Sequence, residues 1–213
     1  MKRYSHVAWD FNGTVLDDVS IGITAVNRLL ERRSLKKIES EDAYRELFDF
    51  PVIDYYKRLG FDFDKYPYEE LAIEWVNEYN ALSHLAPARE GIEKALSRLK
   101  DAGVKQYIVS ASSIDMLRVQ LDALGLSGYF EEIIGSDNIH AYGKKEATRL
   151  FASTLDKSRT VFIGDTVHDY DSAAYAGIDC LFISGGHQSK EKLLTRSDKI
   201  FDSFEQITDI ILG

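Results

Sequence analysis

The residues best suited to chemistry in this chain are carboxylates that follow short apolar runs. Asp10 ends the run that begins at Val7, and Gly164-Asp165 follows the run that ends at Ile163, with Asp169 four residues beyond Asp165. If the two runs are neighbouring strands, Asp10 and Asp165 converge, and their charges repel each other unless a hard cation lies between them. Mg²⁺ is the natural candidate because it prefers oxygen ligands. A carboxylate in such a site can also act as a nucleophile.

Backbone amides and hydroxyl groups near these runs could bind an anion. Gly13 permits a tight turn after the first run and, with Thr14, could present N–H groups to an anion. Ser110 follows another apolar run, and its hydroxyl group together with the amide of Ala111 could hold phosphate oxygens. Ser110 could equally be the N-cap of a helix that starts near Ser113.

Lys144 precedes a helix-like segment and can supply the positive charge that paired aspartates need. Its ammonium group would offset their repulsion and contact a phosphate group as a point charge. Lys145 is adjacent, and an ordinary solvated lysine is the alternative for either position. Of the two, we expect Lys144 to be the functional residue.

The composition is typical of a globular protein with an acidic surface. The chain has 213 residues, 45% of them hydrophobic, and a net charge of −9. This is enough apolar material for one domain with an insert or for two small domains. Nucleic acid is not an expected partner, because binding to its phosphate backbone needs clustered Lys and Arg. A small phosphorylated metabolite remains compatible, since one lysine and a few amides can hold a phosphate group.

The N-terminal segment and the single cysteine favour a cytoplasmic protein. The apolar segment that ends at Asp10 is too short for a signal peptide or a membrane span. Cys180 lies within an apolar run, so we expect a buried thiol and no intrachain disulfide. The sequence is compatible with a monomer or a homodimer.

Apolar runs and helical stripes alternate along most of the chain. The runs are continuous, which is typical of strands buried on both faces in a parallel sheet. Helix-like segments between them imply right-handed βαβ units, so we predict an α/β fold with a three-layer, Rossmann-like parallel sheet. The predicted strands are residues 7–11, 104–109, 130–134, 160–163 and 180–183.

The interval between the first two predicted strands is far longer than one crossover helix needs. It carries several helical stripes, and Pro51 and Pro67 fall where helices could begin. We therefore predict a helical cap domain over residues 17–85, inserted into a core domain formed by residues 1–16 and 86–213. The aromatic residues of the insert are expected to pack between its helices.

The chain resembles the haloacid dehalogenase superfamily of aspartate-nucleophile phosphatases in the order and placement of these motifs. Its helical insert resembles the cap of the phosphoglycolate phosphatase and β-phosphoglucomutase branches. The resemblance implies a Mg²⁺-dependent phosphoric monoester hydrolase in which Asp10 forms an aspartyl-phosphate. It implies that Asp10, the backbone carbonyl of Asn12 and Asp165 hold the metal, and that Asp169 supports them. The residues that carry the resemblance are Asp10, Ser110, Lys144, Asp165 and Asp169.

Asn12 departs from the pattern of the family. Most of its phosphatases carry aspartate at this position, which protonates the leaving alcohol and then activates water. Asn12 keeps the backbone carbonyl, but its amide cannot exchange a proton in this way. General acid–base help is worth about 10² to 10⁴-fold in rate. We therefore expect a slow phosphatase, or one confined to good leaving groups such as acyl or aryl phosphates, or an impaired relative that binds a phosphorylated ligand or a protein partner.

Two other branches of the superfamily also lack aspartate at this position. Phosphonatases cleave a P–C bond with a Schiff-base lysine on the cap, and Lys36, Lys37 or Lys57 could be so placed. Haloalkanoate dehalogenases need no metal, so Asp165 and Asp169 argue against that branch.

Three further features are weaker candidates. The dipeptide Asn12-Gly13 is prone to deamidation, which could create aspartate in a preparation. His168 lies beside the second aspartate motif and could replace the missing proton shuttle. The other residues of this kind are His140 and His187, and Arg45, Arg58 and Arg89 as groups that could bind a substrate anion from the cap side.

Overall fold

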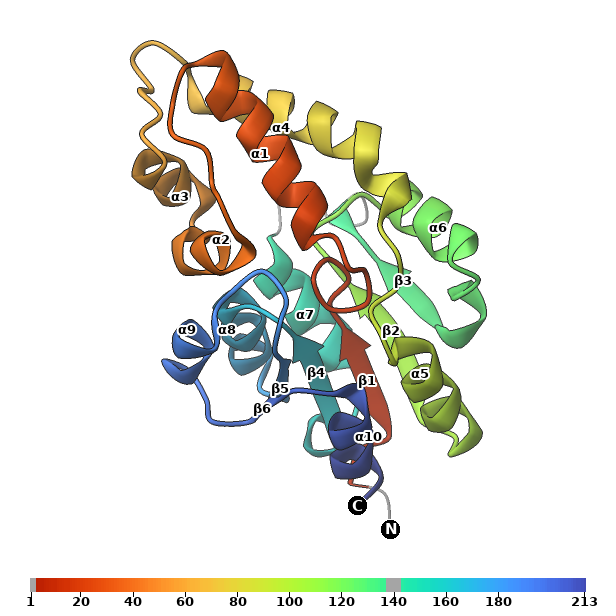
Figure 1. Ribbon diagram of the computed structural model, residues 1–213. Coiled ribbons are helices and arrows are strands. Elements are labelled where there is room, and N and C mark those ends of the chain that lie inside the picture. Colours follow the sequence, from red (N-terminus) through yellow and green to blue (C-terminus); the bar gives the residue numbers. More distant parts are fainter. Residues whose placement is uncertain (1–2, 137–142) are drawn as a thin grey trace.

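The computed structural model describes residues 3–136 and 143–213 as a parallel sheet with helices on both faces (Figure 1). His140 lies outside the described residues. The predicted α/β class with a parallel sheet is confirmed. The strands are β1 (His6–Trp9), β2 (Lys105–Val109), β3 (Glu132–Ile134), β4 (Thr160–Gly164), β5 (Asp179–Ile183) and β6 (Ile200–Phe201).

The strand order places β1 at the centre of the sheet. The order is β3-β2-β1-β4-β5-β6, and all neighbouring pairs are parallel. Trp9 of β1 pairs with Ile108 of β2 and with Ile163 of β4. Residues that follow these three strands therefore meet at one edge of the sheet, where open α/β sheets bind ligands. This register brings Asp10 and Asp165 to the same edge.

The bounds of the predicted strands differ from the observed ones by one or two residues, and one observed strand was not predicted. β1 ends at Trp9 instead of residue 11, because the carbonyl oxygen of Phe11 accepts hydrogen bonds from the amides of Val15 and Leu16, both at 2.9 Å, and closes a turn. β6 is not among the predicted strands, since a strand of two residues is too short to give a recognisable pattern.

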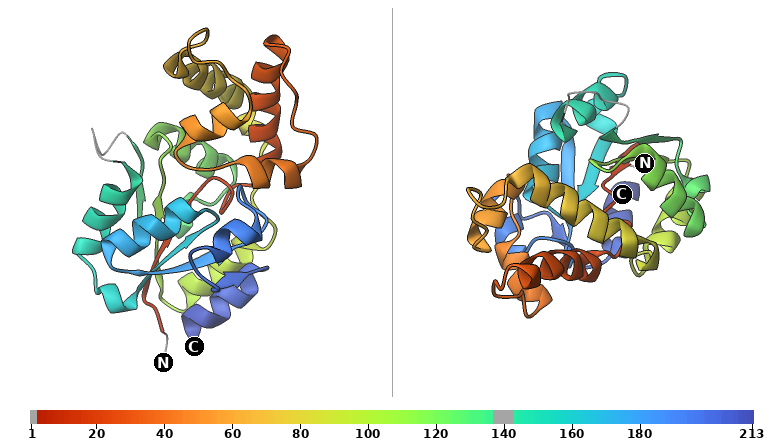
Figure 2. Two further views of the ribbon diagram at one scale, coloured as in Figure 1. Left: turned by 90° about the vertical axis from the view of Figure 1, so that its left-hand side faces the viewer. Right: turned by 90° about the horizontal axis from the view of Figure 1, so that it is seen from above.

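Helices cover both faces of the sheet and complete the three layers (Figure 2). Alternate strand residues point to opposite faces, so Trp9 and Ile163 pack in one apolar cluster, and Ala8 and Phe162 in the other. The first cluster includes residues of α5 (Ile92–Asp101), α6 (Ile114–Ala123) and α10 (Phe204–Leu212), and the second includes residues of α7 (Lys144–Ser153), α8 (Val167–Ala176) and α9 (Lys190–Leu194). Single 3₁₀ turns are η1 (Ser83–Leu85), η2 (Ser127–Tyr129) and η4 (Lys157–Arg159).

Four helices between β1 and β2 lie over the carboxyl end of the sheet (Figures 1 and 2). Their apolar side chains form a cluster of their own, in which Leu29, Tyr55 and Leu71 are buried. Pro51 and Pro67 are the N-cap residues of the third and fourth of these helices, so both helices begin directly after a proline. The helices are α1 (Val19–Arg32), α2 (Glu41–Leu47), α3 (Val52–Arg58) and α4 (Tyr68–Leu82).

Cys180 and the apolar character of the helices can be compared with the sequence-based expectations. Cys180 lies in β5, where it is buried and free, as expected from its apolar run. Within residues 3–136 and 143–213, no helix combines the length and the apolar character needed to cross a membrane.

Candidate active site

Three aspartates meet at the carboxyl end of the central strands. Asp10 follows β1, Asp165 follows β4, and Asp169 lies in the first turn of α8. One carboxylate oxygen of each lies within 4.8 Å of the others. All three side chains are buried. Oxygen atoms grouped in this way can hold a divalent cation together.

Lys144 supplies positive charge to this cluster. It is the first residue of α7, and its buried ammonium group donates to Asp10 Oδ1 and, at 2.5 Å, to Asp169 Oδ1. Lys145 is exposed on the same helix. Of the two adjacent lysines, Lys144 is therefore the one that contacts the aspartates.

The aspartates carry more negative charge than Lys144 balances. Burial raises the pKa of Asp10, and the charges of Asp169 and Asp165 add to this rise, although Lys144 opposes it. Burial also raises the pKa of Asp165. Burial would raise the pKa of Asp169 too, but the charge and hydrogen bond of Lys144 lower it. An added cation would relieve the two carboxylates whose pKa values are raised.

Protein donors fix the orientation of Asp165 and Asp169. Asp165 accepts hydrogen bonds from the hydroxyl group of Thr14 at 3.0 Å and from the amide of His187 at 2.6 Å. Asp169 Oδ2 accepts from the amide and the hydroxyl group of Thr166 at 2.9 and 2.7 Å. Since its Oδ1 contacts the lysine, both oxygens of Asp169 are engaged. Asp165 and Asp169 are thus both held in a fixed orientation, and Asp169 alone of these two is also paired with Lys144.

Two glycines allow the backbone to approach Asp165 closely. Gly13 has a φ of 74°, and a Cβ atom on it would lie 2.3 Å from Asp165 Oδ2 and 2.6 Å from the ring of His187. A Cβ atom on Gly186 would lie 2.3 Å from the same oxygen. A larger residue at either position would displace the carboxylate. The role of Gly186 could not be read from the sequence, because the pair Gly185-Gly186 looks like an ordinary turn.

The predicted anion-binding turn is built differently from our expectation. The amide of Gly13 donates to the carbonyl oxygen of Leu16 at 3.0 Å and to Asp18 Oδ1 at 2.8 Å. The hydroxyl group of Thr14 is engaged by Asp165. The N–H group of Gly13 is thus not available to an anion in this structure, because the turn after β1 and the start of the insert consume it.

Ser110 is buried directly after β2. Its hydroxyl oxygen accepts a hydrogen bond from the amide of Ser112 at 3.1 Å. The N-cap of α6 is Ser113, whose side chain accepts from the amide of Met116, so the N-cap alternative for Ser110 is wrong. The neighbouring Ala111 is exposed.

The side chain of Asn12 connects three segments of the chain. Its Nδ2 donates to Asp18 Oδ2 at 2.8 Å and to the hydroxyl oxygen of Tyr79 at 2.7 Å. Its Oδ1 accepts from the hydroxyl group of Ser112 at 2.8 Å. The amide is therefore fully engaged by protein groups.

His187 is a buried member of the site, although its sequence context makes it a weak candidate. Its Nε2 lies 3.2 Å from Asp18 Oδ1, and its Nδ1 lies 2.9 Å from the hydroxyl group of Tyr44. Burial alone would lower the pKa of His187, but the Asp18 carboxylate raises it to about 9. His187 is thus a second positive charge beside Asp165.

Three further residues of the site, Asp18, Tyr44 and Tyr79, could not be identified from the sequence. A helix N-cap aspartate and two tyrosines at helix-packing positions carry no distinguishing pattern.

Two arginines brace the site through backbone carbonyls. Arg45 donates from Nε to the carbonyl oxygen of Gly186 at 2.9 Å. Arg89 donates to the carbonyl oxygens of Gly13 at 2.7 Å and of Ser184 at 2.8 Å. Both guanidinium groups therefore hold loops next to Asp165 in place.

The other candidates form contacts outside the aspartate cluster. Arg58 pairs with Asp49 at 3.0 Å. The ring of His168 stacks on Phe50 of the insert, with ring centres 4.7 Å apart. The three lysines considered for a Schiff base are exposed. They pair with carboxylates of the insert itself, as Lys36–Glu39, Lys37–Glu31 and Lys57–Asp54.

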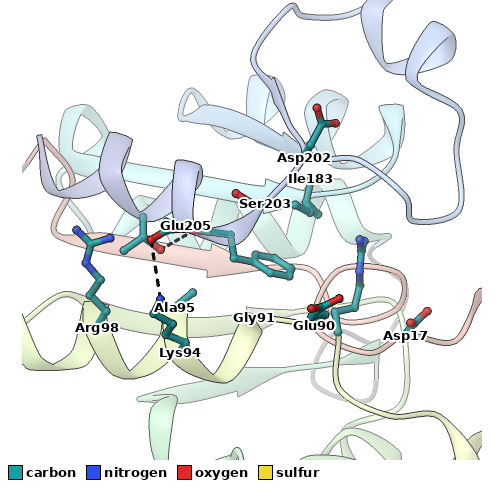
Figure 3. Close-up of a pocket in the computed structure, with 13 residues that line it drawn as sticks. Asp17, Glu90, Gly91, Lys94, Ala95, Arg98, Ile183, Asp202, Ser203 and Glu205 are labelled. Atoms are coloured by element: carbon teal, nitrogen blue, oxygen red, sulfur yellow. Dashed lines mark hydrogen bonds and ion pairs between the residues drawn. The ribbon is translucent and has the colours of Figure 1, made fainter.

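A separate cavity of about 530 Å³ lies between the start of α5 and the start of α10 (Figure 3). Lys94 and Glu205 form an ion pair across it at 3.9 Å. Both cationic and anionic side chains line it, so the lining does not favour ions of one charge. The charged lining residues are Asp17, Arg89, Glu90, Lys94, Arg98, Asp202 and Glu205.

Lys144→Met is expected to lower the free energy of unfolding of the metal-free protein by roughly 3–5 kcal/mol, because it leaves buried carboxylates without their partner. Lys145→Met is the matched control and should change this free energy by no more than about 0.5 kcal/mol, as an exposed substitution. Urea denaturation at pH 7 with a chelator present measures both. Equal stability of the two variants would contradict the assigned role of Lys144.

Asn12 is expected to remain an amide in the folded protein. Deamidation needs the backbone nitrogen of Gly13 to attack the side-chain carbon of Asn12, and hydrogen bonds hold both groups in place. Peptide mapping by mass spectrometry after days at pH 8 should find unmodified Asn12 in native protein and conversion in urea. Conversion at the same rate in both samples would refute this protection.

Sequence comparison relates the chain to known enzymes. A family model described as haloacid dehalogenase-like hydrolase matches residues 7–183. Phosphoglycolate phosphatase of Caulobacter vibrioides is 27% identical over 209 residues, which cover 93% of this chain and 86% of that protein. Phosphoglycolate phosphatase of Salmonella typhi is 28% identical over 183 residues, which cover 83% of this chain and 67% of that protein.

Solved structures share the fold. A haloacid dehalogenase-like family protein from Streptococcus pneumoniae aligns with a TM-score of 0.83 and 21% identity, over 98% of this chain and 99% of that chain. CbbY from Rhodobacter sphaeroides, solved in complex with phosphate, aligns with a TM-score of 0.71 and 19% identity, over 96% of both chains. The family predicted from the motifs is confirmed: the chain belongs to the haloacid dehalogenase-like hydrolases and is an enzyme of their phosphatase group.

Proposed function

We propose that the chain is a Mg²⁺-dependent phosphoric monoester hydrolase that acts on a small phosphorylated metabolite through an aspartyl-phosphate at Asp10. The main support is the charge of the site: three buried carboxylates share the ammonium group of Lys144. The excess negative charge favours a divalent cation, and a cation in turn favours a phosphoryl group beside Asp10.

The residues present suit Mg²⁺. All donors are oxygen atoms, which Mg²⁺ prefers, and we propose as ligands the carboxylates of Asp10 and Asp165 with the backbone carbonyl of Asn12. Asp169 would support this set, since its Oδ1 is paired with Lys144 and its Oδ2 accepts from the hydroxyl group of Thr166. When bound, the cation would neutralise phosphoryl oxygens beside Asp10.

The chain's own groups would then carry the reaction. A carboxylate oxygen of Asp10 attacks phosphorus, the bond between phosphorus and the substrate oxygen breaks, and the leaving oxygen departs with the electron pair as an alkoxide that takes a proton from water. Lys144 favours the ionised form of Asp10 and would contact the phosphoryl group, and the Ser110 hydroxyl would donate to another of its oxygens. Water then attacks phosphorus of the aspartyl-phosphate, the bond between phosphorus and the Asp10 oxygen breaks, and the Asp10 carboxylate and inorganic phosphate are released, while the proton of the attacking water passes to phosphate or to solvent water.

Asn12 limits the first step in this proposal. Its amide cannot protonate the leaving oxygen, and its hydrogen atoms are already donated to Asp18 and Tyr79. The leaving group must therefore depart as an alkoxide or take its proton from water, which favours good leaving groups such as acyl or aryl phosphates.

We further propose that residues 17–85 form a cap over a core of residues 1–16 and 86–213. Support comes from the separate apolar cluster of α1–α4 and from polar contacts such as Tyr44–His187 between this insert and the sheet. Substrate selection would lie in the cap, and the name phosphoglycolate phosphatase of two relatives favours a small phosphorylated acid. The cytoplasmic location and the monomer or homodimer stay predictions.

One alternative has a specific observation in its favour. Because the Asn12 amide is fully engaged and cannot shuttle a proton, an impaired chain that binds a phosphorylated ligand or a partner without turnover would have the same site. Phosphate release over many turnovers separates the two functions. The phosphonatase-like alternative has less support, since Lys36, Lys37 and Lys57 pair with carboxylates of the insert.

Asp10→Asn should abolish both phosphate release and formation of a phosphorylated protein, because the nucleophile is lost. Asp115→Asn, which replaces an exposed aspartate on α6, is the control and should retain both. Phosphate release from acetyl phosphate and p-nitrophenyl phosphate, with intact-mass detection of the phosphorylated chain, measures the effect with Mg²⁺ and with a chelator. Turnover by Asp10→Asn, or undiminished turnover with the chelator, would refute the proposal.

The rate of phosphate release should fall steeply as the pKa of the leaving alcohol rises. Since no group at position 12 protonates the leaving oxygen, negative charge builds up on this oxygen in the transition state. A more basic leaving oxygen should therefore give a slower reaction. A series of substituted phenyl phosphates and alkyl phosphates at saturating Mg²⁺ tests this. Similar kcat/KM values for phenyl and alkyl phosphates would contradict it and would require another acid.

A further inference from the structure

The Asn12 side chain lies between the two places where the chain enters and leaves the helical insert. Asp18 directly precedes α1, and Tyr79 lies in the last turns of α4, close to where the chain returns to the sheet. Asn12, in the turn after β1, bonds to both, and its oxygen accepts from Ser112 in the loop after β2. One amide thus joins the first and last helices of the insert to the edge of the sheet.

Asp18 is fully satisfied as a carboxylate acceptor. Its Oδ1 accepts from the amide of Gly13 at 2.8 Å and faces Nε2 of His187 at 3.2 Å. Its Oδ2 accepts from Nδ2 of Asn12 at 2.8 Å and from the hydroxyl group of Tyr79 at 2.7 Å. With an exposed fraction of 1%, Asp18 depends on these donors, because an unpaired buried carboxylate is costly.

The hydrogen bonds have a direction that only an amide at position 12 provides. Asn12 donates one hydrogen atom to Asp18 and the other to Tyr79, and Tyr79 passes its own hydrogen atom on to Asp18. An ionised aspartate at position 12 has no hydrogen atom to donate and would place a second carboxylate against Asp18. A protonated aspartate has only one.

We propose that Asn12 is a positioning residue, whose amide holds the helical insert closed over the sheet by bonding Asp18 and Tyr79 at once. Asparagine is required here by the buried Asp18 carboxylate. The inference rests on the proposed function only in that closure matters to catalysis if the insert covers the substrate. Asn12 therefore holds the insert in position and does not transfer a proton.

Asn12→Asp introduces the usual residue of the family but should disrupt the position of the insert. Asn12→Asp removes two donors and sets two carboxylates against each other, so the insert should move away from the sheet. Combining Asn12→Asp with Asp18→Asn exchanges the two side chains. The amide at position 18 can then donate to the carboxylate at position 12 and to Tyr79, and Tyr79 can donate to that same carboxylate. The double variant should therefore close again.

The position of the insert can be measured without substrate or metal. Ile73 of α4 and Val119 of α6 are exposed, at 64% and 69%, and Cys180 is buried. Spin labels on Ile73→Cys and Val119→Cys then report the distance between the insert and the sheet by pulsed electron paramagnetic resonance. The parent labelled protein should give a narrow distribution.

Asn12→Asp should shift this distribution to longer distances and broaden it, and Asn12→Asp/Asp18→Asn should return it to that of the parent. Tyr79→Phe, which removes one of the bonds to the insert without adding a charge, should broaden it and serves if Asn12→Asp does not fold. Ser112→Ala is the matched control, since it removes the bond of the same amide that does not reach the insert, and should leave the distribution unchanged.

A distribution for Asn12→Asp or, if that variant is unfolded, for Tyr79→Phe that superimposes on the parent would overturn the proposal. Failure of the double variant to return the distribution to that of the parent, or a shift in Ser112→Ala equal to that in Asn12→Asp, would overturn it as well. Because no turnover is measured, a failure here is distinguishable from a failure of the proposed phosphatase function, which is decided by phosphate release and phosphorylation at Asp10.

Discussion

The contact of the Lys144 ammonium group with Asp10 and Asp169 is the interaction on which the site depends. Without it, three buried carboxylates would repel one another at the edge of the sheet. With it, the charge is only partly balanced, and the pKa values of Asp10 and Asp165 remain raised by burial. Lys144 thus holds the aspartates together, while the remaining negative charge of the site favours binding of a cation.

The fold turns this charge arrangement into a fixed geometry. β1 lies between β2 and β4, so Asp10 and Asp165 begin at neighbouring strand ends and need no long side chains to meet. Gly13 and Gly186 leave no Cβ atom in the space that Asp165 occupies. Arg89 then links the turn at Gly13 to the loop after β5. Sheet order, two glycines and one arginine together hold the carboxylates in place.

The sequence predicts the parts of the site that depend on local pattern. Asp10 and Asp165 follow buried strands, and this is visible as an apolar run before each. The contact between Asn12 and Tyr79 could not be predicted, because it depends on how α4 packs against a loop 67 residues away in the chain. His187 was undervalued for the same reason, since a histidine after a Gly-Gly turn gives no sign that Asp18 will meet it. Sequence periodicity places elements, but the packing of distant elements creates such contacts.

The central claim is that the excess charge of the aspartate cluster draws in a divalent cation. The crystal structure of the protein grown in the presence of Mn²⁺ tests this claim most directly. Mn²⁺ replaces Mg²⁺ at oxygen-ligand sites and can be located by its anomalous scattering. We predict one strong anomalous peak in contact with carboxylate oxygens of Asp10 and Asp165 and with the carbonyl oxygen of Asn12, while Lys144 keeps its contact with Asp169. A map with no peak at this cluster, or with a peak that touches neither Asp10 nor Asp165, would contradict the account.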